Sequence, residues 1–290
     1  MKLKSWALIV SMAAIGILTS GSIDPARAVT VTLYDGTSGV TPDAYTATPY
    51  LYFGNTGGSQ SVGGGVTTLN TSAGEAIQAG YSNYDRNGQL VNSLFPILDN
   101  NAGYTLSFTV KVNSQTNNGT NGDYRAGFSA IVLGSNNRGI ELGFRNPNTK
   151  DPLNAPDIFS QANASFNSLG EQNSNLGGVL SNLTKYDLKV VGNNYTLTSG
   201  ANTLLSGSLR DYTAATGPLT GVYRTPNLIF LGDDTQSAGA SVDIANIALT
   251  TNSPIPEPSS TIGIGLAIAF AAKLRRKLSK IDRQVTKLLK

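Results

Sequence analysis

The chain of 290 residues contains no cysteine and no histidine. Without cysteine there is no disulfide framework, no zinc ribbon and no thiol nucleophile. Without histidine there is no Ser-His-Asp triad, no histidine-ligated metal and no histidine general base. Several large classes of enzyme are therefore excluded before any motif is considered.

Charged residues are also scarce, at 13% of the chain, and they are unevenly placed. Residues 1–28 hold three bases and one acid, and residues 259–290 hold eight bases and one acid. The residues between them hold 10 bases and 16 acids. The net charge of +3 therefore comes from the two ends and does not indicate a nucleic-acid partner. The acidic middle is long enough to bury the core of one domain.

The N-terminus has the pattern of a secretory signal peptide. Lys2 and Lys4 precede a nearly uninterrupted apolar stretch at 6–19, and Ala26 and Ala28 supply the small residues of an A-x-A cleavage site. A short membrane anchor or a buried helix is the alternative, but the apolar run is short for a membrane span. We expect signal peptidase to cleave after Ala28 and the protein to be exported.

The C-terminus has three parts in a fixed order. A proline-rich motif comes first, formed by Pro256, Glu257 and Pro258. A mostly apolar stretch at 259–272 follows, and a helix of this length rises about 21 Å, so it spans the membrane only with help from its flanks. A basic cluster ends the stretch: Lys273, Arg275, Arg276 and Lys277. The positive-inside rule keeps this basic membrane flank in the cytoplasm and places the preceding domain outside.

This order and spacing resemble the PEP-CTERM sorting signal of exported Gram-negative and cyanobacterial proteins. The resemblance covers 254–290 and implies that exosortase, a membrane protease-transpeptidase, recognises the motif and cuts near it. The chain differs from the family in its tail, because 278–290 continue past the basic cluster with apolar residues at helical spacing, a pattern typical of an amphipathic helix on the inner leaflet. A single-pass anchor that is never processed is the alternative. We expect an inner-membrane precursor that is released to the cell envelope or the extracellular space.

Residues 29–253 are predicted to form a single all-β domain, a two-sheet antiparallel jelly-roll sandwich. Alternation of apolar and polar residues is clearest over 104–112. Further strands are expected at 29–34, 45–53, 76–84, 126–133, 140–144, 186–190, 195–197, 203–209, 228–231 and 240–249. The turn at 192–194 predicts a hairpin, and a change of apolar parity predicts a bulge near 245–246. Residues 163–183 are expected to form a loop with one helical turn at most.

Three stretches of this body, 103–108, 138–144 and 186–190, resemble the concanavalin-like, laminin-G-like jelly rolls of bacterial surface proteins. Such domains with exosortase-type tails are often called choice-of-anchor domains, because different members carry different sorting signals. The resemblance is one of pattern and includes no catalytic motif. It implies the sandwich fold and leaves the activity open.

A glycoside hydrolase normally needs two carboxylates that flank the scissile bond. The body has three glutamates before the sorting motif, Glu75, Glu141 and Glu171, and no two of them share a strand at the required spacing. Pairs formed by aspartates stay open, because no spacing selects one. Glu141 lies on an alternating strand and is expected to face solvent. We therefore expect no catalytic residue and no enzymatic activity.

No cofactor is required by any motif, and calcium is the one metal that the oxygen-rich loops suit. The weak candidate ligands are Asp85, Asn87, Asp99, Asp233 and Asp234. None of these clusters completes an EF-hand loop, and Asx-Gly pairs are also ordinary turn formers. The sequence therefore assigns no metal site.

Aromatic residues near the glycine-rich and asparagine-rich loops suggest a sugar-binding surface, since flat rings stack on sugar rings. They are Tyr45, Tyr50, Tyr52, Phe53, Tyr81, Tyr84 and Tyr223. Packing in the core of the sandwich is the alternative. We expect a non-enzymatic envelope or matrix protein that associates with extracellular polysaccharide and with no nucleic acid. A secreted glycoside hydrolase and a purely structural surface protein are the other two possibilities.

Overall fold

The computed structural model describes residues 28–252, apart from 56, 86, 118–123, 147–155 and 217–220. The described residues all fall within one compact unit, Arg27–Pro254. The predicted signal helix, the cleavage residue Ala26, the sorting motif at 256–258 and the basic flank at 273–277 lie outside the described residues. Ala28 is exposed and directly precedes the first strand. No helix in the described part of the chain is long and apolar enough to cross a membrane.

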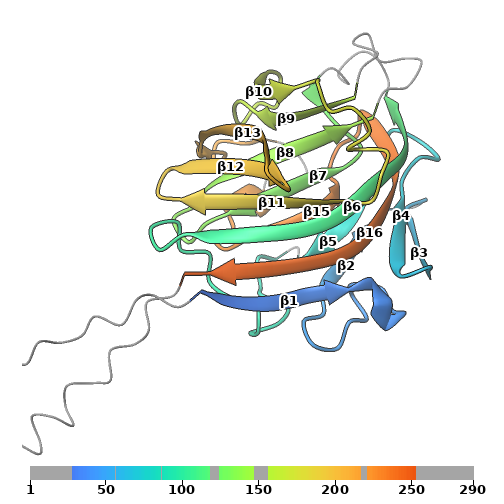
Figure 1. Cartoon of the computed structure of the whole chain (residues 1–290), viewed down its shortest axis with the longest axis horizontal. Helices are drawn as coiled ribbons and strands as arrows, with labels where there is room; N and C mark the ends of the chain where they lie inside the picture. Colours follow the sequence, from blue (N-terminus) through green and yellow to red (C-terminus); the bar gives the residue numbers. More distant parts are fainter. Residues whose placement is uncertain are drawn as a thin grey trace, which may run out of the picture. The chain divides into compact units, whose positions relative to one another are not determined.

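The described strands form two antiparallel sheets of eight strands each. Figure 1 shows the arrangement of the strands. Sheet A has the order β13-β12-β11-β6-β16-β4-β3, and β1 pairs with β16. Its strands are β1 (Val29–Asp35), β3 (Ser59–Gly63), β4 (Val66–Asn70), β6 (Tyr104–Asn117), β11 (Thr184–Val191), β12 (Asn194–Ser199), β13 (Asn202–Ser208) and β16 (Ala238–Thr251). The predicted antiparallel two-sheet sandwich is confirmed.

Sheet B has the order β10-β9-β8-β7-β15-β5-β2, and β14 pairs with β8. Its strands are β2 (Leu51–Gly54), β5 (Ala79–Ser82), β7 (Ser129–Leu133), β8 (Arg138–Arg145), β9 (Asp157–Gln161), β10 (Leu169–Asn173), β14 (Arg210–Asp211) and β15 (Ile229–Asp233). Two short 3₁₀ helices, η1 (Gly36–Ser38) and η3 (Val222–Arg224), lie in the connections.

Two local predictions are confirmed by the register of the strands. The β11–β12 hairpin closes where Val191 pairs with Asn194, and Gly192 takes a φ of +60° in the two-residue turn. The pairing of β16 with β6 shifts between Ile244 and Asn246, which is the predicted bulge. Both features follow from local sequence alone, a turn-forming pair in one case and a switch of apolar parity in the other.

Five strands were not predicted, and the strands expected at 45–53, 76–84 and 126–133 were predicted too long. The unpredicted strands are β3, β4, β9, β10 and β14, and β10 lies inside the expected loop at 163–183. β3 and β10 are edge strands in which polar residues prevail, so they show no apolar alternation. The triple glycine at 63–65 forms the β3–β4 turn, with φ values of +61° and +80° at Gly64 and Gly65. The strand expected at 45–53 is only β2, because its first half forms turns.

The main core lies between the inner faces of the two sheets. Phe108 of β6 packs edge-on against Phe144 of β8, with ring centroids 5.6 Å apart, and both side chains are fully buried. An antiparallel sheet commonly exposes one face to solvent. In this protein the outer face of sheet B is also covered by side chains. Its apolar cluster comprises Ile131, Leu133, Tyr212, Ala215, Tyr223, Leu228 and Phe230. This second core surrounds the candidate site.

Candidate functional site

Four polar side chains meet under the cover of the outer face of sheet B, and we name them the outer cluster: Arg125, Glu141, Tyr223 and Asp234. Glu141 stands on β8 and is 1% exposed, Asp234 directly follows β15, Tyr223 comes from η3, and Arg125 precedes β7. Arg125 Nη2 lies 2.8 Å from Asp234 Oδ2 and Arg125 Nη1 lies 3.3 Å from Glu141 Oε1. One buried cation thus bridges two carboxyl groups from neighbouring regions of the sheet.

The Tyr223 hydroxyl joins the same two carboxyl groups. Its oxygen lies 2.5 Å from Glu141 Oε2 and 2.9 Å from Asp234 Oδ2, so these two carboxyl oxygens are no more than 5.4 Å apart. A phenol has one proton and donates to one carboxylate at a time, so the second short contact needs a proton on a carboxyl group. Burial and the charge of Asp234 raise the pKa of Glu141 to about 8, against the opposing effects of Arg125 and the Tyr223 bond. Glu141 is therefore the group that holds this proton near neutral pH.

Aromatic rings cover the outer cluster. Phe166, from the β9–β10 connection, has its ring 4.8 Å from the ring of Tyr223 and 5.8 Å from that of Tyr212, centroid to centroid. The Arg125 guanidinium carbon lies 4.9 Å from the Phe166 ring centroid, within cation–π range. Phe166 has a φ of +52°, a left-handed conformation that is strained for a bulky side chain. The ring is therefore placed over the cluster at an energetic cost.

Several buried polar atoms at this place have no hydrogen-bond partner among the described residues. They are Arg125 Nη1, Glu141 Oε1, Gln161 Oε1 and Asp234 Oδ1. Arg125 Nη1 and Glu141 Oε1 are close enough for an ion pair but are not aligned for a hydrogen bond. A buried polar atom without a partner costs about 1–3 kcal/mol. Three acceptors and one donor thus remain for hydroxyl groups or water.

Retaining glycosidases hold their two carboxyl groups about 5–5.5 Å apart, and the bridging Tyr223 hydroxyl limits the distance from Glu141 Oε2 to Asp234 Oδ2 to at most 5.4 Å. One oxygen of each carboxyl group is nevertheless already engaged, since Glu141 Oε2 contacts Tyr223 and Asp234 Oδ2 accepts from both Arg125 and Tyr223. The side chains are also almost completely covered, at 1% exposed for Glu141 and 6% for Asp234. The arrangement described here is therefore a closed proton-sharing pair rather than an open catalytic one.

The predicted solvent exposure of Glu141 is wrong. β8 alternates apolar and polar residues, but its outer face carries the loops with Tyr212 and Tyr223 instead of water. Glu171, another of the three glutamates, lies on β10 and bonds to strands of both sheets. Its Oε2 accepts from Ser160 on β9, Tyr195 on β12 and Arg210 on β14, at 2.5, 2.8 and 2.6 Å. These three donors hold the pKa of Glu171 below its ordinary value, against partial burial.

The candidate calcium ligands are not brought together. Asp85 accepts from the backbone N–H groups of Asn87 and Gln89 in an exposed turn. Asp233 is buried and accepts from the Thr71 hydroxyl at 2.6 Å, and its burial raises its pKa well above the ordinary value. Asp234 binds Arg125 instead. No group of three or more His, Cys, Asp or Glu side chains that could hold a metal ion occurs among the described residues.

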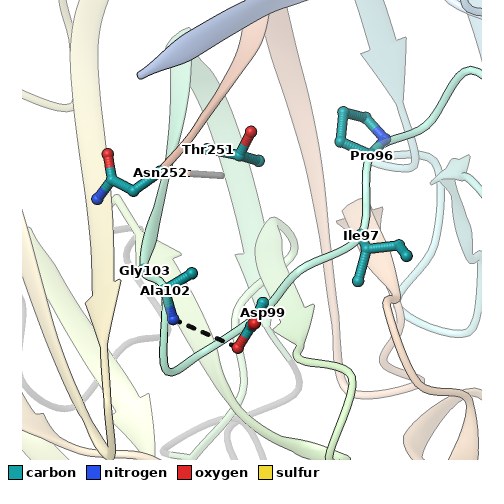
Figure 2. A pocket seen from close by; sticks show the side chains of 7 residues that line it. All are labelled: Pro96, Ile97, Asp99, Ala102, Gly103, Thr251 and Asn252. Carbon is teal, nitrogen blue, oxygen red and sulfur yellow. Dashed lines mark hydrogen bonds between the residues drawn. The ribbon is translucent and has the colours of Figure 1, made fainter. Parts of the chain in front are cut away.

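Asp99 lines a separate surface groove of about 320 Å³, which Figure 2 shows. Its carboxylate turns back onto its own loop and accepts from the backbone N–H groups of Asn101 and Ala102, at 2.8 and 3.3 Å. The other residues that line the groove are Pro96, Ile97, Ala102, Gly103, Thr251 and Asn252. Asp99 is the one charged side chain among the residues that line it, so the groove offers no set of metal ligands.

Most of the candidate sugar-stacking rings belong to the main core. Tyr50 and Tyr81 are buried there, and Tyr45 and Tyr52 pack against it. Phe53 is half-buried on β2. Tyr84 and Tyr223 alone among the candidates belong to the outer-face core, which Phe166 and Tyr212 complete. Arg125, Gln161, Phe166 and Tyr212 were not predicted from the sequence. One signal for a covered site was present, because β7 is apolar on both faces and the outer face of its sheet therefore had to be covered.

Fold and site together define a two-sheet antiparallel β-sandwich with a closed polar cluster on one outer face. No family model and no curated protein matches the chain. Among solved structures, the carbohydrate esterase of the Shiga toxin-encoding bacteriophage phi24B is similar over 78% of this chain and 100% of its own, with a TM-score of 0.51 and 11% identity. At this identity the likeness concerns the fold alone.

Two further structures are similar at lower TM-scores. The exoplasmic/lumenal domain of VIP36 in a Ca²⁺/Man2-bound form matches 79% of this chain and 90% of its own, with a TM-score of 0.40 and 11% identity. The alginate lyase AlyC3 in complex with dimannuronate matches 65% of this chain and 75% of its own, with a TM-score of 0.37 and 9% identity.

Proposed function

We propose that the protein is exported by its signal peptide and sorted by an exosortase-type system. On this proposal it associates with extracellular polysaccharide without catalysing a reaction, and the contact is made on the outer face of sheet B. The observation that carries the proposal is the outer cluster, where buried hydrogen-bonding atoms without partners lie beneath aromatic rings. Signal peptidase and exosortase act on the precursor, which is held at the inner membrane until it is processed.

The chemistry of this face supports a saccharide as the ligand. Sugars present hydroxyl groups for hydrogen bonds and a flat C–H face for stacking on aromatic rings. Tyr84 and Phe166 are both half-buried, so each keeps ring surface at the edge of the outer-face core. Arg125 keeps 11% of its side chain exposed beside Phe166. Aromatic and polar groups thus lie next to each other at one surface.

The hydrolase alternative is less favoured because the carboxyl pair is closed. Both carboxyl groups already share bonds with Tyr223, and Glu141 has almost no exposed surface. A purely structural role is less favoured because the unpartnered atoms of the outer cluster lower stability, and such a role gives no reason to keep them. The fold likeness to a carbohydrate esterase is consistent with a saccharide ligand, but fold alone does not decide function.

Co-sedimentation tests the proposal directly. The exported protein, purified from its host, is mixed with the extracellular polysaccharide of the same host, with and without EGTA. We expect binding that is weakened by Tyr84→Ala and unaffected by Leu94→Ala, which removes an exposed side chain elsewhere. Absence of binding would leave only the structural role. Release of reducing sugars by the wild type but not by Glu141→Gln would establish the hydrolase instead.

Intact mass tests the export and sorting part independently. We expect the protein recovered from the host envelope or medium to begin at Val29 and to lack 259–290. A mass that still includes 259–290 would contradict processing by exosortase and favour a permanent single-pass anchor. A mass that still includes 1–28 would contradict cleavage by signal peptidase.

A further inference from the structure

We infer that the outer cluster is a subsite for an uncharged, hydroxyl-rich sugar residue and that it discriminates against uronic acids. This inference rests on the proposed association with polysaccharide and adds the chemical class of the ligand. It follows from three features of the described residues: the balance of unpartnered donors and acceptors, the charge at the site, and the way in which Phe166 covers it.

The unpartnered atoms select a ligand that donates more hydrogen bonds than it accepts. Glu141 Oε1, Gln161 Oε1 and Asp234 Oδ1 are acceptors, and Arg125 Nη1 is the single donor. Each sugar hydroxyl has a proton to donate, whereas a uronate carboxylate has acceptors only. A neutral sugar therefore satisfies the site, and a uronate carboxylate would bring acceptors toward acceptors.

The charge of the outer cluster also disfavours a uronate. Asp234 neutralises Arg125 through a 2.8 Å ion pair, so no free positive charge is left for an anion. The region from 29 to 258 also holds 16 acids and 10 bases, which repels an acidic polymer at long range. A protein that recognised a polyuronate would be expected to present an excess of arginine or lysine.

Phe166 packs over the outer cluster, so access to the subsite requires the Phe166 ring to move. Phe166 sits in a tight turn that closes through the backbone bonds Ala162 N–H to Ser168 O and Phe166 N–H to Asn163 O. Its ring contacts join it to Arg125, Tyr212 and Tyr223, and its left-handed backbone is strained where it stands. Rotation of the side chain about its own bonds moves the ring away from the outer cluster and bares the unpartnered atoms, while the turn stays closed and the backbone keeps its left-handed conformation. The displaced ring is then placed to stack on the bound sugar.

The test uses the host polysaccharide before and after chemical reduction of its carboxyl groups, which converts uronic acids to the matching neutral sugars. Binding of the exported protein is measured by affinity electrophoresis in gels that contain either polymer at equal concentration and ionic strength. We expect affinity for the reduced polymer to equal or exceed that for the native one, by about tenfold or more if uronates are abundant. Lower affinity for the reduced polymer would overturn the inference and leave the proposed function standing. Binding to neither polymer would overturn both.

Two variants assign the effect to the outer cluster. Asp234→Asn and Glu141→Gln each turn a carboxyl group into an amide, and the first also frees the charge of Arg125. We expect Asp234→Asn to weaken binding of the reduced polymer by about threefold to tenfold and to strengthen binding of the native, acidic polymer. Glu141→Gln keeps an acceptor at the Oε1 position and should leave binding of both polymers unchanged. Asp85→Asn is the matched control, because it makes the same change of charge in an exposed turn. Equal affinities of these variants and the wild type would show that the sugar binds elsewhere. If Asp234→Asn fails to fold, Gln161→Leu keeps the test valid, because it removes the unpartnered acceptor Gln161 Oε1.

Discussion

The proton on Glu141 should make the folded protein lose stability as the pH rises through the neutral range. Burial and the neighbouring Asp234 raise the pKa of Glu141 to about 8 in the folded state, from an ordinary value of 4.5. Between these two pKa values the folded protein binds one more proton than the unfolded chain. The free energy of unfolding is therefore highest below the lower pKa and decreases as the pH rises from the lower pKa to the upper one. One proton corresponds to a slope of about 1.4 kcal/mol per pH unit between about pH 5 and pH 8. Asp233, whose pKa is also raised by burial, acts in the same direction.

Few groups in this sequence can contribute to a change of stability between pH 5 and pH 8. The chain has no histidine and no cysteine, so no side chain titrates at its ordinary pKa between about pH 5 and pH 8. Groups whose pKa is lowered, such as Glu171, change stability only at more acidic pH. A neutral-range slope therefore reports on carboxyl groups that are forced to keep a proton.

Glu141→Gln isolates the contribution of one group. Glutamine has the shape of the protonated acid and its amide donates toward the Tyr223 oxygen, so the variant should unfold as the wild type does at pH 5 and be the more stable protein at pH 8. The measurement is urea unfolding followed by tyrosine fluorescence at several pH values. Parallel stability curves for the two proteins would refute a proton on Glu141, and a wild-type stability that rises with pH would refute the burial argument as a whole.

Three further outcomes are expected. Asp157→Ala should destabilise the protein by about 1–3 kcal/mol in urea unfolding, because it removes a buried carboxylate that binds the fully buried Arg145 through two bonds of 2.8 and 2.7 Å. Gly80→Ala should cost about 1–3 kcal/mol in the same assay, since the added Cβ would lie 2.4 Å from the Phe230 ring. Millimolar Ca²⁺ should leave the Tm unchanged in calorimetry, because backbone N–H groups, Thr71 or Arg125 already engage the candidate ligands, and a Tm that rises with Ca²⁺ concentration would contradict this.

The fold was predictable because its longest signals are local. The alternation in β6, the turn at Gly192 and the parity switch in β16 each depend on neighbours within a few residues, and each is confirmed. The edge strands β3 and β10 were not predictable in this way. Their residues are mainly polar, and what makes them strands is hydrogen bonding to a neighbour that is already in place.

The outer cluster was not predictable because its parts come from four separate places in the sequence. Glu141 and Asp234 are 93 positions apart, and the side chains that join them belong to a bend before β7 and a short 3₁₀ helix. Alternation in β8 shows that two faces differ, but not whether loops or water cover the polar one. The apolar outer residues of β7, Ile131 and Leu133, were the available evidence that the neighbouring Glu141 would be buried.

Stability alone does not account for the outer cluster. Next to it, Ile131, Leu133 and Phe230 cover the same face of sheet B with apolar side chains, so the fold evidently accepts such residues there. Buried ionic groups are often replaced by apolar ones without loss of stability, and unpartnered polar atoms and a left-handed phenylalanine each add a cost. These costs occur together at the outer cluster, and a saccharide hydroxyl that bonds the unpartnered atoms would remove the first of them. The pH series measures the cost in the free protein, and a bound sugar that satisfies the acceptors should shift the pH dependence as well as the stability. A ligand that stabilises the protein equally at every pH would therefore bind away from Glu141.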